Sequence, residues 1–224
     1  MRRENFKDLE YLEDSLEKDL SWRKRELLQL KLAINKNNST LHKSTLIRSG
    51  IALLCAHWEG FIRTATNYYL LHIIDNKVKV KDLNNNFIAY ALKSNFKNLK
   101  DTEKITVYTR FLNQVDKCGD NFFKLDFTDE PDARIVNTES NLSSKLFNEI
   151  LQSLDLDCTP FLLKKQLIDR DILKQRHEIV HGEDSRRIDY NFEDVYVQLM
   201  EIIEKVRNQI VDAAENKEYL RNRT

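Results

Sequence analysis

The sequence predicts an all-α protein, a helical bundle of long antiparallel helices with an irregular excursion in its middle. The chain of 224 residues contains only four glycines and two prolines, and sheet proteins need more of these residues for their turns. Apolar residues recur at steps of three, four or seven along several long stretches, with charged residues between them. This spacing is typical of amphipathic helices and leaves almost no signal for strands.

Four long helices are expected to form the core. Apolar residues from Phe6 to Ile34 predict the first helix over about residues 3–35, and "NKNNST" then breaks it. A second stripe, which includes Trp58, predicts a helix over about 42–75, with Trp58 packing against the first helix. The last two core helices are expected over about 160–181, opening at a proline, and about 190–220.

The excursion covers about residues 76–155 of a single domain, 1–224. Helices are expected over 84–96 and 101–115, and a short one over 142–154. The stretch 118–141 gathers Gly119 and Pro131 with many Asp, Asn and Thr residues. We expect an ordered but irregular segment there, with room for a short pair of strands.

The composition limits how this protein could bind nucleic acid, zinc or a membrane. Charged residues make up 32% of the chain and sum to zero, so nucleic acid would have to bind at a local basic patch. The three cysteines are far apart and without C-x-x-C spacing, which favours a reduced, cytoplasmic protein without a zinc knuckle. The chain contains no stretch of about 18 apolar residues without a charge, so no membrane helix is predicted. No cofactor is expected.

The stretch "LKQRHEIVHGE" (173–183) contains two overlapping motifs. His177, Glu178 and His181 form H-E-x-x-H, which in zinc hydrolases holds a metal and activates water. Glu201 lies where some of these enzymes carry a third ligand, but the sheet that such enzymes need is not predicted. Arg176 and His181 form R-x4-H, a pair that could cleave RNA without a metal. Neither spacing is specific, since Arg170 and His177 also form an R-x6-H pair.

A helical wheel makes Arg176 unusual. On residues 161–180 it falls in the middle of the apolar arc, with Asp169 beside it. A guanidinium on a buried face is costly unless it is paired or lines a cleft, so a structural Arg176–Asp169 pair is one alternative. His177 and His181 lie about 100° and 140° from Arg176 on the wheel. Gly182 predicts a helix end at His181, and a symmetric dimer could bring Arg176 of one chain to His181 of the other.

"RHEIVHGE" at the end of a helix, followed by a long last helix, resembles the HEPN superfamily, whose signature is R-x4-6-H with a polar residue after the arginine. His177 occupies that polar position, where asparagine is commoner. "LLCAHWEGFIRTA" (53–65) and "TESNLSSKLFNEIL" (138–151) resemble the MAE-type branch of HEPN proteins in particular. The three matches together span most of the chain.

The resemblance implies a metal-independent endoribonuclease assembled at a dimer interface, with Arg176 and His181 as its catalytic residues. An arginine can hold the scissile phosphate, and a histidine can transfer protons near neutral pH. His177 and Asp169 are supporting candidates. Glu59 either forms an exposed ion pair with Arg63 or lies in the cleft and orients the motif.

The expected partners are RNA, a second copy of the chain, and an antitoxin or other regulatory protein. Such enzymes often act as toxins or phage-defence effectors. Residues expected to guide the RNA backbone are Arg170, Lys174, Arg186 and Arg187. The alternative is a non-catalytic HEPN module that binds nucleotide or protein, and a zinc hydrolase is the third possibility. Relatives without activity often lose the arginine or the histidine, and this chain keeps both.

Overall fold

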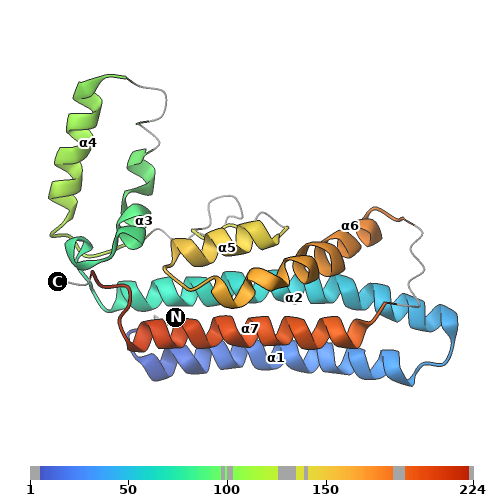
Figure 1. The fold of residues 1–224 in the computed structure, drawn as a ribbon. Helices are drawn as coiled ribbons and strands as arrows, with labels where there is room; N and C mark the ends of the chain where they lie inside the picture. The colour runs from blue at the N-terminus through green and yellow to red at the C-terminus, as the bar shows by residue number, and fades with distance from the viewer. Residues whose placement is uncertain are drawn as a thin grey trace, which may run out of the picture.

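The computed structural model describes residues 6–96, 99, 103–125, 135–138, 141–183 and 190–221. Three long helices form its base: α1 (Leu9–Lys36), α2 (Thr40–Asp75) and α7 (Phe192–Glu215). They lie side by side, and α1 runs antiparallel to the other two (Figure 1). The all-α prediction is therefore confirmed. Among the described residues, no helix is long and apolar enough to cross a membrane.

The predicted apolar stripes form the core between these helices. Leu12, Leu16, Leu20 and Leu27 of α1 are fully buried, as the three- and four-residue spacing requires. Trp58 of α2 is buried as well. The groups that orient its ring belong to residues 142 and 147 and not to α1. Its Nε1–H donates to the carbonyl of Leu142 (3.2 Å), and its ring lies edge-on to Phe147 at 4.8 Å. Trp58 therefore holds a second layer on α2.

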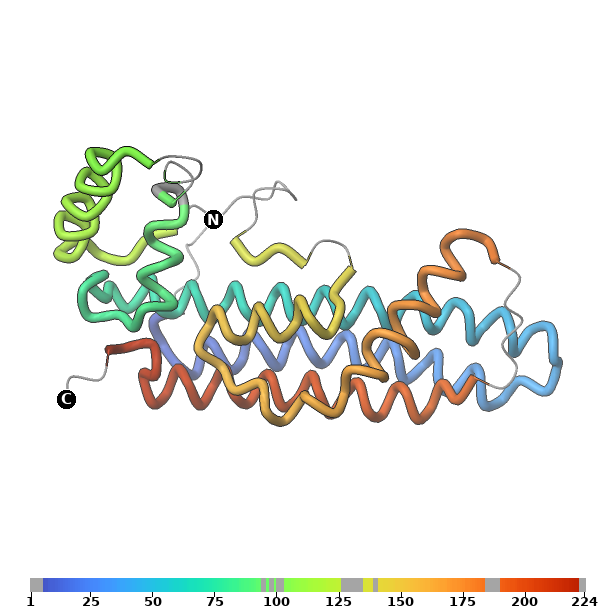
Figure 2. Tube along the Cα trace, turned by 45° about the horizontal axis from the view of Figure 1, so that its top comes forward, coloured from blue at the N-terminus to red at the C-terminus, as the bar shows by residue number. Residues whose placement is uncertain are grey.

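That second layer consists of α5 (Ser144–Ser153) and the motif segment, which returns over α2 in the opposite direction (Figure 2). The sequence placed α5 in the excursion, but Phe147 on its inner face packs against both Trp58 and Phe161. The motif segment is not one regular helix from 160 to 181. It consists of a 3-10 helix, η4 (Thr159–Lys164), a π-helix, η5 (Leu167–Lys174), and a short α-helix, α6 (Gln175–Val180).

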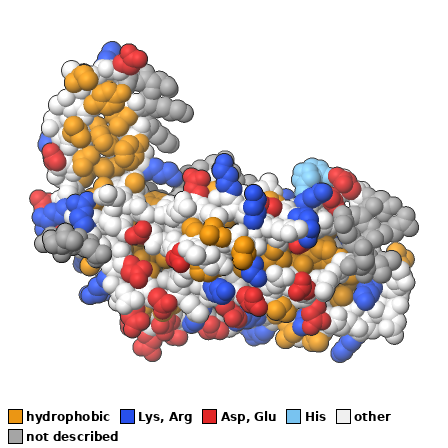
Figure 3. All heavy atoms as spheres, in the orientation of Figure 1, with side chains coloured by type: hydrophobic (Ala, Val, Ile, Leu, Met, Phe, Trp, Pro, Cys, Tyr) orange, Lys and Arg blue, Asp and Glu red, His pale blue; other side chains and the backbone are white. Residues whose placement is uncertain are grey.

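Two further helices of the excursion project from one end of the bundle (Figure 1). They are α3 (Asn85–Phe96) and α4 (Ile105–Cys118), preceded by a short 3-10 turn, η1 (Val80–Asp82). No residue of α4 is buried, and Ile105, Tyr108 and Leu112 form an exposed apolar stripe, seen in orange in Figure 3. In the described parts of the chain, strand pairing is limited to two isolated bridges, Lys79–Phe122 and Leu83–Leu220. Residues 126–134 and 139–140 of the expected irregular stretch lie outside the described residues.

A buried polar cluster joins α1 to α2 on the face opposite to α5. Arg23 donates through Nε and Nη2 to both carboxylate oxygens of Asp19, at 2.8 and 3.1 Å. Its Nη1 donates to His57 Nδ1 (3.4 Å), and His57 Nε2–H donates to Glu26 (2.7 Å). Burial lowers the pKa of His57, while the bond to Glu26 acts in the opposite direction. His57 is thus a core histidine whose two ring nitrogens both have partners.

The close approach of α2 and α7 predicts that Gly50→Ala destabilises the protein. A methyl group on Gly50 would lie 2.5 Å from Phe192 Cε2, so the ring or the helix must shift. We expect the free energy of unfolding in urea to fall by about 1–3 kcal/mol. Gly119→Ala is the control: Gly119 has a helical backbone (φ −54°) and 3.4 Å of space, so its stability should stay equal or rise. Equal stability of the two variants would contradict this packing.

Candidate functional site

Arg176 lies in α6, where the motif segment crosses α2. Its side chain is half-buried, and Nη1 donates to Asn141 Oδ1 at 3.1 Å. Asn141 comes just before α5, so this bond ties the guanidinium to the second layer of the bundle. The bond fixes one nitrogen of the planar fork, and within the described residues no other group accepts a hydrogen bond from this guanidinium.

Cys55 marks the point of α2 that Arg176 faces. Its side chain is 4% exposed, and burial raises the pKa of its thiol to about 11. The positive charge of Arg176 lowers this pKa and the negative charge of Glu59 raises it. Both charges therefore act on the same small, buried side chain, so Arg176 of α6 and Glu59 of α2 both lie near the Cys55 thiol.

Glu59 is half-buried in α2 and has a defined partner. Its Oε1 accepts a hydrogen bond of 2.7 Å from Thr138 Oγ1, and Thr138 is itself buried. Glu59 thus fixes the chain that leads into α5. Of the two interpretations that the sequence left open, this contact and the nearby charge of Arg176 favour a place beside the motif.

Asp169 has a different role from the pairing expected on the wheel. Its two carboxylate oxygens accept hydrogen bonds from the backbone N–H (2.8 Å) and the hydroxyl (2.6 Å) of Ser144, the first residue of α5. In the described part of the chain, Asp169 and Arg176 do not form an ion pair. The wheel assumed about 100° per residue, but residues 167–174 form a π-helix with i→i+5 bonds and wider turns. Seven residues of this segment therefore do not bring Asp169 back beside Arg176.

His177 and His181 are exposed at the end of α6. Their ring centroids are 4.2 Å apart, as expected for residues one turn apart, and they give the pale-blue surface in Figure 3. The predicted helix end at His181 is confirmed. The N–H groups of Gly182 and Glu183 donate to the carbonyls of Ile179 (3.2 Å) and Glu178 (3.0 Å), and Gly182 has a φ of 73°. This pattern is the Schellman motif, which favours glycine at that position.

Arg48 and Asn141 belong to the site, although the sequence did not single them out. Arg48 is half-buried on α2, and its Nη1 donates to the carbonyl of Glu183 at 3.4 Å, just after the motif. The helical wheel contained a signal for Arg48, because it shares a face of α2 with Cys55 and Glu59. Asn141 belongs to the stretch 138–151 that resembles the MAE-type branch, but no sequence pattern paired it with Arg176, 35 residues further along the chain.

Two of the four residues expected to guide RNA belong to the described part of the chain. Arg170 and Lys174 line a groove of about 480 Å³ beside the start of α7, together with Tyr190 and Asp194. Arg170 also donates to the carboxylate of its neighbour Asp171 (2.7 Å). The other two expected residues, Arg186 and Arg187, lie outside the described residues. A role of these four residues in binding RNA remains a prediction.

The zinc alternative finds little support in the side chains. No group of three or more His, Cys, Asp or Glu side chains in the described residues is arranged to hold a metal ion. Glu201, the possible third ligand, lies 3.6 Å from Lys164 Nζ in an ion pair. His177 and His181 therefore have each other as neighbours but lack a third donor.

A protein-family model described as RiboL-PSP-HEPN matches residues 18–216 of the chain. The protein belongs to this HEPN family. The match extends from α1 through the second layer to the end of α7 and includes the whole motif segment. No curated protein and no solved structure matches the chain. Membership of the MAE-type branch remains a prediction.

In this HEPN protein, Asp169 is expected to stabilise α5 through Ser144 and not to form an ion pair with Arg176. We predict that Asp169→Ala lowers the free energy of unfolding by about 1.5–3 kcal/mol, because two bonds to a carboxylate are lost. In a double-mutant cycle measured by urea unfolding, Asp169→Ala and Ser144→Ala should couple by about 1 kcal/mol or more. Asp169→Ala and Arg176→Ala should be additive within about 0.5 kcal/mol. A strong Asp169–Arg176 coupling would restore the structural ion pair.

Proposed function

We propose that this HEPN protein is a metal-independent endoribonuclease that acts in a cleft shared by two copies of the chain. One observation carries the proposal. A half-buried arginine is held by Asn141 beside Glu59 and Cys55, and the same short helix ends on two exposed, adjacent imidazoles. A permanent cation next to groups that transfer protons near neutral pH is what cleavage of a phosphodiester requires.

The reaction needs no metal. One imidazole takes the proton of the ribose 2′-hydroxyl, and the 2′-oxygen attacks the adjacent phosphorus. The bond from phosphorus to the 5′-oxygen breaks, and an imidazolium gives that oxygen a proton. The products are a 2′,3′-cyclic phosphate and a 5′-hydroxyl. Arg176 holds the phosphate and stabilises the charge that develops on its oxygens. DNA, without a 2′-hydroxyl, is not cleaved.

Within this scheme His181 is the main proton-transfer group, and His177 orients or assists it. Arg48 approaches the end of the motif through the Glu183 carbonyl, so it supplies a second cation for the RNA backbone. Glu59 is a positioning residue, because its hydrogen bond to Thr138 holds the chain next to Arg176.

A second copy of the chain completes the site in this proposal. Arg176 is turned toward α2 and α5, whereas His181 is exposed at the last turn of the motif helix. A twofold axis beside α6 would bring His181 of one protomer to Arg176 of its partner. Val180, an apolar residue that is 58% exposed next to His181, would then be covered, as interface residues commonly are.

The biological role that fits this activity is that of a toxin or phage-defence effector, controlled by an antitoxin or another regulatory protein. All three cysteines are free, as in proteins that work in the reducing cytoplasm, where RNA is available. The competing function is a HEPN module that binds nucleotide or protein without catalysis.

Cleavage of RNA in excess chelator tests the proposal directly. Purified protein should cut a structured RNA in EDTA and leave ends with cyclic phosphate. His181→Ala and Arg176→Ala should each lower the rate at least about 100-fold, since each removes a group that acts in the transition state. Arg176→Lys should also be impaired, because lysine lacks the planar fork.

His42→Ala is the matched control, since His42 is an exposed histidine near the start of α2. Its rate should equal that of the wild type. If wild-type protein leaves the RNA intact while still binding it, the non-catalytic module is correct. Cleavage that is lost in chelator and restored by zinc would instead support the hydrolase.

A heterodimer of two inactive chains tests whether the site is shared. Arg176→Ala and His181→Ala chains, carrying different tags, can be co-expressed and purified as a mixed dimer. If Arg176 of one protomer works with His181 of its partner, the mixed dimer has one intact site and about half the wild-type activity. Each parent homodimer should remain inactive. A mixed dimer as inactive as its parents would show that the two residues act within one protomer.

A further inference from the structure

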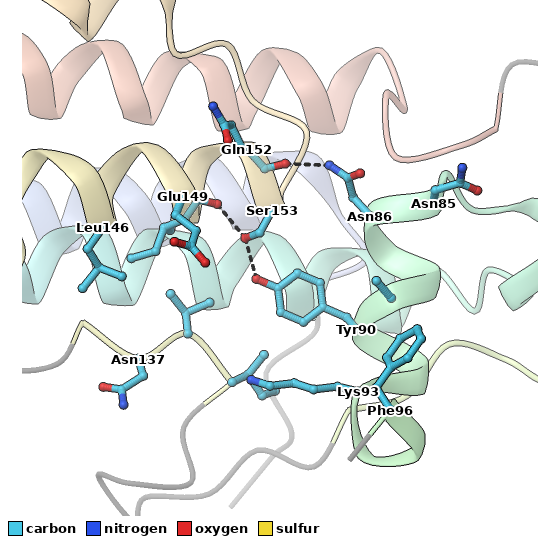
Figure 4. A pocket seen from close by; sticks show the side chains of 14 residues that line it. Asn85, Asn86, Tyr90, Lys93, Phe96, Asn137, Leu146, Glu149, Gln152 and Ser153 are labelled. Atoms are coloured by element: carbon cyan, nitrogen blue, oxygen red, sulfur yellow. Dashed lines mark hydrogen bonds between the residues drawn. The ribbon is translucent and has the colours of Figure 1, made fainter. Parts of the chain in front are cut away.

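A second candidate site lies at the other end of α5. A groove of about 700 Å³ opens between α3, α5 and residues 135–137 (Figure 4). Its volume falls within the range that binds small organic groups in proteins. It is separate from Arg176 and the histidines, because none of the motif residues lines it.

The walls of the groove combine aromatic, apolar and amide groups. Tyr90 and Phe96 of α3 supply rings, and Ile150 of α5 adds an apolar surface. Amide side chains come from three different segments: Asn85, Asn137 and Gln152. Among the described residues of the lining, the charged ones are Lys93 and Glu149. Such a surface suits a flat, uncharged group with hydrogen-bonding edges.

Hydrogen bonds hold these walls in place. Ser153 Oγ donates to the carbonyl of Ile150 (2.7 Å), so the hydroxyl of Tyr90 donates to Ser153 Oγ (2.7 Å). Asn86 Nδ2 donates to the carbonyl of Gln152 at 2.6 Å. Both contacts join α3 to the last turn of α5 (Figure 4). The ring of Tyr90 is therefore fixed before any ligand arrives.

Described residues on the way from the groove to the motif contact the elements around Arg176. Asn137 lines the groove, and the next residue, Thr138, donates to Glu59 beside Cys55. Asn141 then holds Arg176. The ten residues of α5, which run from the motif side along the groove, span about 15 Å, a length that a few nucleotides of extended RNA can bridge.

We propose that this groove binds an unpaired base of the RNA substrate, a few nucleotides from the phosphate that is cleaved. This inference rests on the proposed nuclease function and adds the feature of RNA that the enzyme recognises. Proteins read unpaired bases by stacking them on aromatic rings and by bonding their edges to polar side chains. Tyr90 and Phe96 provide the rings, the amides provide the edge contacts, and Lys93 contacts the adjoining phosphate.

A consequence of this placement is a preference for single-stranded RNA. A base in a duplex is stacked and paired, so it cannot enter a groove on a helix surface without leaving the stack. Cleavage should therefore occur in loops or ends of RNA, at a fixed distance from the base that the groove holds.

The test uses full-length His181→Ala protein, which should bind RNA without cutting it. The probe is an unpaired RNA of about 12 nucleotides with a photoreactive 4-thiouridine placed at each position in turn. Fluorescence anisotropy gives the affinity, and mass spectrometry gives the crosslinked peptides. Crosslinks are expected in residues 85–96 or 146–153, from a base at a fixed distance from the cleavage site.

Two substitutions alter the groove and leave the motif residues unchanged. Ala89→Trp fills it from an exposed position on α3, and Lys93→Glu reverses the positive charge that the described lining supplies. Each should weaken RNA binding about tenfold and, with His181 restored, change the cleavage sites. Ala33→Trp and Lys36→Glu are the controls, because both residues are exposed on α1, and they should behave as the unsubstituted protein.

The outcomes separate the two proposals. If Ala89→Trp and Lys93→Glu bind and cut RNA as their controls do, or if every crosslink lies outside the groove, the base-binding proposal is wrong. The nuclease proposal stands in that case, provided that cleavage still depends on His181. If wild-type protein does not cut RNA and the His181→Ala protein does not bind it, both proposals fail.

Discussion

The hydrogen bonds between the motif segment and the beginning of α5 are the constraint on which the candidate site depends. Asp169 holds Ser144 by two bonds, and Arg176 donates to Asn141. Together they fix the start of a short helix whose inner face packs on Trp58 through Phe147. A ten-residue helix is marginal by itself in water. Its order therefore comes from this packing and from a carboxylate at its N-terminus, where negative charge is stabilising.

The π-helix gives this arrangement its geometry. Residues 167–174 turn more slowly than an α-helix, so Asp169 points to α5 while Arg176, further along, faces α2. Asp169 and Arg176, which would be neighbours on a regular helix, therefore contact different parts of the protein. Asp169 anchors the second layer, and Arg176 keeps donors available beside Glu59. Departures of this kind from regular helix are frequent at functional sites.

Much of the fold could be predicted from the long apolar repeats, because their spacing is a property of neighbouring residues in the chain. The stripes on α1 and α2 and the helix end at Gly182 could be predicted because three- and four-residue spacing and the need for a positive φ are local properties. The motif spacing also placed His177 beside His181. The excursion was harder. Its helix α5 is short, and its attachment to Trp58 and Phe161 depends on residues far away in the chain.

By itself, the sequence determined the helical class, the three long helices of the base and the HEPN resemblance, because periodic burial and a local motif suffice for all three. Only the tertiary structure decided which groups surround Arg176. Asn141 and Arg48 reach the motif from segments separated from it by 35 or more residues, and no local pattern encodes such contacts. The partner of Asp169 was decided in the same way, because the π-helix changes its direction through bonds that a 3.6-residue repeat does not anticipate.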